Sequence, residues 1–191
     1  SLSFAGLYGA GVFGWHITTL GLVAIILNVI AVPGTVLGGF VDERIGPKPT
    51  IILAVAGLMV GTLGGLSIDP NHVLFVIEVP PRAEGAAPLT SVAELTFLGF
   101  SAIVGLCVGP AQSSSRTFMA RLAPRDMTTE FFGLYAFAGK ATAFMAPFLI
   151  GVVTDATNNQ RYGLVVVFVF LAVGFLGFLT VREERAEIPK A

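Results

Sequence analysis

Long apolar stretches, almost free of charge, divide the chain more clearly than any alternating pattern does. They lie at about residues 18–40, 49–68, 95–115, 131–153 and 162–181, and within them only Lys140 is charged. A helix needs about 20 apolar residues to cross a hydrocarbon core of about 30 Å. Open strands cannot satisfy their backbone in lipid, and these stretches are too long for barrel strands. The pattern predicts an all-α, polytopic transmembrane helix bundle with five full spans.

A shorter apolar stretch at about residues 2–13 precedes the first full span. Gly14, Trp15 and His16 separate the two stretches. The short stretch follows Ser1 without a basic lead, so we do not expect it to be a signal peptide. We interpret it as the truncated end of a further span, in a sequence that begins inside a longer protein. The whole of 1–191 is then one transmembrane bundle of a longer protein.

The stretch 69–94 is the one long connection between spans. Its segment 73–79, VLFVIEV, has a strand-like composition, and Pro80 and Pro81 end it. We expect a short hairpin or an interfacial segment here rather than a binding site.

Small residues recur at the spacing that lets helix backbones approach one another in lipid. These are Gly34 and Gly38, then Gly57, Gly61 and Gly65, then Gly105 and Gly109. We expect them to mark packing faces.

Composition agrees with a membrane location and narrows the functional classes. Hydrophobic residues make up 54% of the 191 residues and charged residues 12%, whereas a soluble domain carries about 25% charged residues. The expected solvent is therefore the lipid bilayer. The net charge of −1 gives no indication of a nucleic-acid partner. Cys107 is the only cysteine and no nucleotide-binding loop occurs, so we expect no cofactor.

The basic residues predict the orientation. The segments 42–49, 116–129 and the tail after Val181 hold eight of the eleven: Arg44, Lys48, Arg116, Arg121, Arg125, Arg182, Arg185 and Lys190. The opposite side holds only Arg82 and Arg161. By the positive-inside rule the first group, with the carboxyl terminus, is cytoplasmic. Trp15 and Tyr162 then fall near the outer boundary, where amphipathic rings are enriched.

Lys140 is the most informative candidate for a substrate or cavity residue. It follows Glu130 by ten residues, so it lies about 15 Å into the membrane. A charge at that depth costs at least ~2.5 kcal/mol, and a lysine stem is too short to reach either boundary easily. No carboxylate of the chain lies at the same depth. The expected partner is a substrate carboxylate, a group in missing sequence or backbone carbonyls.

A polar stretch, GPAQSSSR at 109–116, is expected to close the span before it at the cytoplasmic side. Gln112 and Arg116 are four residues apart and share one helix face. We interpret Gln112 as a candidate lining residue of a polar path. Arg116 is interpreted as a headgroup or gate contact rather than a substrate ligand.

The segment GFVDERIGPK at 39–48 resembles the loop motif of the major facilitator superfamily, in which a glycine precedes an acid, a base, a second glycine and further bases. Gly39, Glu43, Arg44, Gly46 and Lys48 match those places, with glutamate for the usual aspartate and Pro47 for a usual base. The resemblance implies that these five residues take part in gating. The plain alternative is a charged turn that obeys the positive-inside rule.

The resemblance extends through GPAQ and Ser115–Arg116, then LAP at 122–124, EFFGLY at 130–135 and Gly139–Lys140. These segments are similar to the vacuole-effluxer-like group of that superfamily, the relatives of autophagy-associated vacuolar amino-acid exporters. The resemblance implies twelve helices, of which this chain is the end of the seventh through the twelfth. It also implies a partner, the missing amino-terminal half, and a small solute such as an amino acid.

The expected function is secondary transport by alternating access. A membrane-embedded enzyme or a non-transporting scaffold are the alternatives. The enzyme is disfavoured because His16 and His72 lie outside the spans and no nucleophile–base pair can be assembled. The expected location is a bacterial inner membrane, or a vacuolar membrane in a eukaryote.

Overall fold

The computed structural model describes residues 13–69, 71–74, 76–80, 87, 89–124, 126–157 and 160–181. The elements in this part are α2 (Ile17–Ile45), α3 (Pro47–Leu66), β1 (His72–Val73), β2 (Ile77–Glu78), α4 (Val92–Leu122), α5 (Thr128–Thr157) and α6 (Gln160–Thr180). All five helices are long and apolar enough to cross a membrane. The all-α, polytopic bundle is confirmed. The truncated span expected at 2–13 lies outside the described residues, apart from Phe13.

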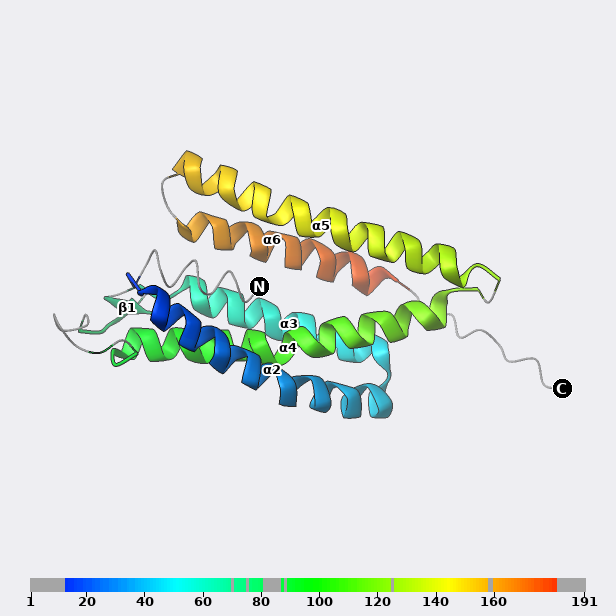
Figure 1. Cartoon of the computed structure of the whole chain (residues 1–191), viewed down its shortest axis with the longest axis horizontal. Coiled ribbons are helices and arrows are strands. Elements are labelled where there is room, and N and C mark those ends of the chain that lie inside the picture. The colour runs from blue at the N-terminus through cyan, green and yellow to red at the C-terminus, as the bar shows by residue number, and fades with distance from the viewer. Residues whose placement is uncertain are drawn as a thin grey trace.

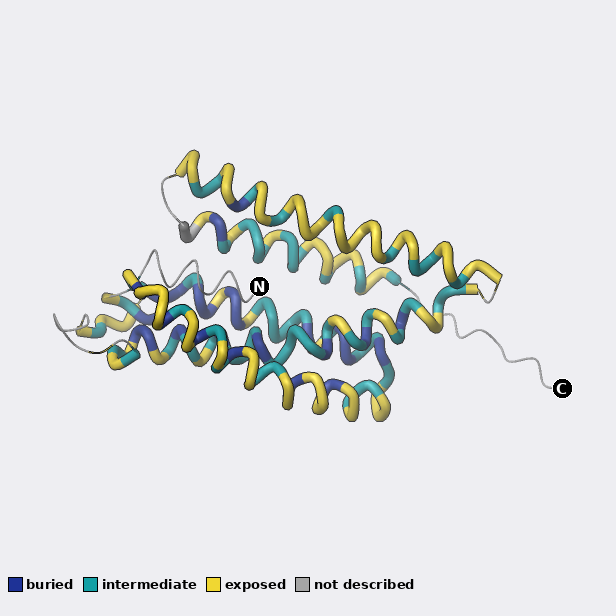
Figure 2. The backbone as a smooth tube through the Cα atoms, in the orientation of Figure 1, coloured by how far each residue is buried: buried dark blue, intermediate teal, exposed yellow. Residues whose placement is uncertain are grey.

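The helices run roughly along one long axis (Figure 1). Helix α4 has its most extensive contacts with α2 and α3. We call α2, α3 and α4 the three-helix core. Helix α6 packs on α3 and on α5, and α5 has few contacts with α4. We call α5 and α6 the outer pair. Buried positions gather in the three-helix core, whereas the outer pair is largely exposed (Figure 2).

Exposed side chains on these helices include many large apolar ones, among them Ile25 and Val32 of α2 and Phe137 and Phe144 of α5. In water such surfaces drive association, but in a bilayer they are the faces that contact acyl chains. The exposed apolar surface is therefore the expected outside of a membrane protein.

A single residue separates α2 from α3. Gly46 has φ 89°, a conformation that glycine adopts without steric cost, and its amide donates to the Asp42 carbonyl. Pro47 then occupies the first turn of α3, where proline is well tolerated. The charged turn expected within the motif at 39–48 is shorter than predicted, because α2 continues through Ile45 and only Gly46 lies between the two helices.

Helix α4 begins with a capping box. The Ser91 hydroxyl accepts from the Glu94 amide, and the Glu94 carboxylate accepts from the Ser91 amide. The helix was predicted to close at Arg116, but it continues to Leu122 and Pro124 follows. The polar stretch is compatible with a helix, because the hydroxyls of Ser113 and Ser115 bond to carbonyls of the preceding turn. Ser115 donates to the Ala111 carbonyl at 2.5 Å.

The short hairpin expected in 73–79 is confirmed. Strands β1 and β2 pair antiparallel, with His72 opposite Glu78 and Val73 opposite Ile77. Among the described residues of the hairpin only Val73 is buried, and it joins the hydrophobic cluster at the start of α4.

The glycine pairs mark backbone packing faces, as predicted. A Cβ added at Gly34 would collide with the backbone of Leu106, and one at Gly38 would lie 2.5 Å from the Cβ of Pro110. A Cβ at Gly61 would lie 3.0 Å from the Phe100 carbonyl oxygen. Helices α2 and α3 therefore approach α4 more closely than any side chain would permit.

The beginnings of α2 and α4 are joined by a buried hydrogen bond. The Trp15 indole donates from Nε1 to Oε1 of Glu94 at 2.7 Å, and Glu94 is only 1% exposed. Phe97 packs edge-on against Trp15, with ring centroids 6.0 Å apart. Trp15 was predicted as a ring near the outer membrane boundary, and the structure adds that its side chain is buried in the core. Tyr162 is half exposed at the start of α6.

Candidate functional site

Lys140 lies near the middle of α5. It follows Thr128 by twelve residues and precedes Thr157 by seventeen, so it is about 18 Å and about 25 Å from the two helix ends. Its side chain is exposed, and no hydrogen bond or ion pair joins it to another described residue. The two carboxylates of α5, Glu130 and Asp155, lie near its ends. Within the described residues Lys140 therefore has no counter-charge.

Gln112 and Arg116 occupy one exposed face of α4, one turn apart. The opposite face of the same turns is buried, because Ser114 is fully enclosed and Phe118 packs on Phe178 of α6 with ring centroids 5.2 Å apart. No hydrogen bond joins Gln112 to Lys140 among the described residues. The two candidate lining residues thus stand on different helices, each with its polar group exposed.

The loop-motif residues do not form one cluster. Gly39, Glu43 and Arg44 are exposed on the last turns of α2. Gly46 makes the break between the helices. Lys48 contacts another helix, because its Nζ donates to the carbonyl of Val181 at 2.6 Å, just beyond the end of α6. A cation at a helix carboxyl terminus interacts favourably with the unpaired carbonyls and the helix dipole.

Two polar atoms that sequence reasoning missed are buried at the same end of the three-helix core. Oδ1 of Asp42 and Oγ of Ser114 have no hydrogen-bond partner among the described residues. Gly34 meets Leu106 and Gly38 meets Pro110, and one turn further along both helices come Asp42 and Ser114. The loop motif matches its acid to Glu43, which is exposed, and not to the buried Asp42. The four-residue spacing of Gly34, Gly38 and Asp42 was the signal that could have found the buried acid.

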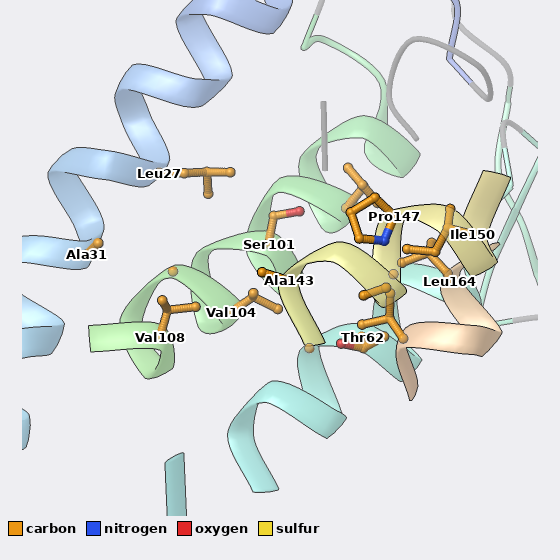
Figure 3. Close-up of a pocket in the computed structure, with 16 residues that line it drawn as sticks. Leu27, Ala31, Thr62, Ser101, Val104, Val108, Ala143, Pro147, Ile150 and Leu164 are labelled. Atoms are coloured by element: carbon orange, nitrogen blue, oxygen red, sulfur yellow. The ribbon is translucent and has the colours of Figure 1, made fainter. Parts of the chain in front are cut away.

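A cavity of about 400 Å³ lies among all five helices (Figure 3). Its lining is apolar apart from Thr62 and Ser101, and the Thr62 hydroxyl already donates to the Leu58 carbonyl. None of the predicted site residues lines it. A zwitterionic solute would lose its hydration there without gaining charged partners. The cavity is therefore separate from the candidate polar site.

The described residues hold no group of three or more His, Cys, Asp or Glu side chains that could bind a metal ion. The candidate polar residues Gln112, Arg116 and Lys140 are single side chains on exposed helix faces. Such groups suit transient contact with a charged solute or with a second bundle.

Comparison with known proteins identifies the family. The family described as "Vacuole effluxer Atg22 like" matches residues 1–190. The chain belongs to this vacuole effluxer family. Autophagy-related protein 22 of Cryptococcus neoformans is 31% identical over 194 residues, which cover 95% of this chain and 32% of that protein. The Candida glabrata protein of the same name is 25% identical over 179 residues, or 90% of this chain and 30% of that protein.

The chain has the same fold as solved transporters of the major facilitator type. The partially occluded, inward-open xylose transporter XylE from E. coli superposes with a TM-score of 0.73 over 96% of this chain and 45% of that one, at 18% identity. Its inward-open form gives a TM-score of 0.71. At this identity the likeness shows the fold alone. The chain spans about a third of the length of its curated relatives and under half of the solved transporter.

Proposed function

We propose that this chain is the carboxyl-terminal six-helix half of a secondary transporter that moves a small polar solute by alternating access. The family match across residues 1–190 is the observation that carries the proposal. Relatives about three times as long leave room for the partner, an amino-terminal half. In transporters of this fold the two halves rock around a site near the bilayer midplane. The name vacuole effluxer and the exposed cation favour an amino acid as the solute.

Lys140 has the central role in this proposal. It holds the solute carboxylate at the midplane, because it is the one cation at that depth and has no partner among the described residues. Gln112 and Arg116 continue the polar surface along α4 toward the end where α2 turns into α3. Glu43 and Arg44, exposed on the last turn of α2, are then available to the other half as gating contacts.

The test replaces Lys140 by methionine and by arginine in the full-length parent protein. Lys140→Met keeps the length of the side chain and removes the charge, so we expect normal expression and melting temperature with amino-acid flux lowered at least tenfold. Lys140→Arg keeps the charge with a wider head group, so we expect partial flux. Flux is measured as uptake of labelled amino acids into proteoliposomes.

Thr142→Val is the matched control, because Thr142 is exposed on the same helix and its hydroxyl already donates to the Ala138 carbonyl. We expect this variant to transport normally. Normal flux by well-folded Lys140→Met would remove Lys140 from the site. Loss of flux together with a lower melting temperature would assign Lys140 a structural role instead.

The proposed orientation places the hairpin outside and the turn between α4 and α5 in the cytoplasm, in a cell or vacuolar membrane, with the carboxyl terminus also cytoplasmic. Single cysteines at Asn71 and Met127, in a Cys107→Ser background, test it because both positions are exposed. An impermeant thiol reagent added to intact cells should label only Asn71→Cys. Labelling of both positions from the same side would contradict the proposed topology.

A further inference from the structure

The hairpin that follows α3 has one polar face and one apolar face. Residues directly opposite one another in an antiparallel pair point to the same side, and successive residues of a strand point to opposite sides. His72 is paired with Glu78, and Val73 is paired with Ile77. The first pair therefore forms a polar face and the second an apolar face, so the hairpin is amphipathic.

The bundle covers only part of the apolar face. Val73 is 6% exposed and belongs to the buried cluster that includes Trp15, whereas Ile77 opposite it is 53% exposed. In the turn between the strands, Val76 is 81% exposed and Leu74 is also exposed. Three large apolar side chains within four consecutive positions are thus left uncovered by the described part of the chain.

The hairpin is fixed to the end of the bundle. Ile68, just before it, is fully buried, and the Val79 amide closes its base by donating to the Asn71 carbonyl at 2.9 Å. Strand β1 contacts α4, and the hairpin lies beside the beginnings of α2 and α4 (Figure 1). The uncovered side chains are therefore held near the level at which these helices leave the membrane.

The apolar surface of the hairpin adjoins a surface that contacts lipid. Val92 and Leu95, in the first turn of α4, are both exposed on a helix that crosses the membrane. Because β1 packs on α4, the uncovered residues of the hairpin are continuous with this lipid-facing surface. The segment 71–80 contains no lysine or arginine, so attraction to anionic headgroups would add little to its attachment.

We propose that the hairpin inserts Leu74, Val76 and Ile77 into the lipid leaflet at this end of the bundle, at the boundary between headgroups and acyl chains. Burial of the three apolar side chains provides the attachment, and the polar face with His72 and Glu78 stays in water. The inserted hairpin then holds the neighbouring ends of α3 and α4 at the membrane surface. This role is separate from solute transport and does not depend on which side of the membrane is cytoplasmic.

Fluorescence quenching in the full-length parent protein tests the insertion. Cys107 and the other cysteines of the parent are replaced by serine, and a single Val76→Cys carries an environment-sensitive NBD fluorophore. The protein is reconstituted in phosphatidylcholine vesicles. The two quenchers are a lipid with a nitroxide near its headgroup and a water-soluble nickel chelate. Asn71→Cys is the matched control, because Asn71 is exposed on the same segment just before β1.

We expect the nitroxide lipid to quench the probe at Val76 about threefold more strongly than the probe at Asn71, and the nickel chelate to give the reverse order. Adding salt or anionic phosphatidylglycerol should leave both ratios unchanged. Ile77→Asp should lower the lipid quenching of the Val76 probe to the level of the Asn71 probe. Ile77→Leu, which keeps the apolar face, should preserve it.

Equal quenching of the two probes by the nickel chelate would overturn the proposal, because the hairpin would then lie in water. Protection of the Val76 probe from both quenchers would overturn it in favour of a protein contact, either the other half or a second copy. Lipid quenching that appears only with phosphatidylglycerol would assign the attachment to charge instead of apolar burial. Unchanged lipid quenching in Ile77→Asp would also contradict insertion of this face.

Discussion

The three-helix core and the outer pair are both made of apolar helices, yet the core is packed and the outer pair is largely exposed. In the most apolar stretch of α3, 39% of the residues are buried, against 6% in α5 and in α6. The difference lies in what faces the neighbouring helix. Gly34, Gly38 and Gly61 face backbone or a close side chain of α4, whereas Gly133 and Gly174 of the outer pair face nothing within 4 Å. In lipid, apolar composition places a helix in the membrane, and small residues in register decide which neighbour it packs against.

The two regions are nevertheless tied together at one end. Phe118 of α4 packs on Phe178 of α6, and Lys48 at the start of α3 donates to the Val181 carbonyl. Toward the other end they are separated by the apolar cavity. The outer pair is therefore held to the core mainly through α6 on α3, whereas α2 and α3 both pack extensively on α4.

The largest effect is expected from adding a methyl group inside the core. Gly34→Ala forces the backbones of α2 and α4 apart at Leu106, so we expect the free energy of unfolding to fall by about 3 kcal/mol. Gly174→Ala is the matched change in the outer pair, where the new methyl group has open space. It should leave stability unchanged or raise it by up to about 1 kcal/mol. Thermal unfolding in detergent measures both, and equal effects would abolish the distinction between the two regions.

A smaller effect is expected from Trp15→Phe. The substitution keeps an aromatic ring against Phe97 but removes the donor to the buried Glu94 carboxylate, so it should cost about 2 kcal/mol. Tyr162→Phe removes a hydroxyl from a half-exposed ring at the start of α6 and should change stability by less than about 0.5 kcal/mol. Similar melting temperatures for the two variants would show that the Trp15–Glu94 bond adds nothing to the core.

The sequence by itself determined the number and approximate position of the described helices. Lipid requires long charge-free helices, so the stretches at 18–40 and 95–115 indicated α2 and α4 without any tertiary information. It also indicated the hairpin after Asn71, the packing glycines and the family, because each depends on a local pattern. The helix ends were less accurate. The polar turns at 42–45 and 116–122 stay helical beyond the hydrocarbon core, where charge no longer marks a boundary.

Only the tertiary structure decided which polar groups are buried and where the cavity lies. Asp42 and Glu43 are adjacent and chemically alike, but the helix turns by about 100° between them, so only Asp42 places an oxygen inside. Trp15 and Glu94 are 79 residues apart, and no local pattern predicts their hydrogen bond. The cavity is lined by residues of five helices, and the sequence of no single helix indicates it. Burial is a property of how helix faces meet, and that is fixed by the register of one helix on another.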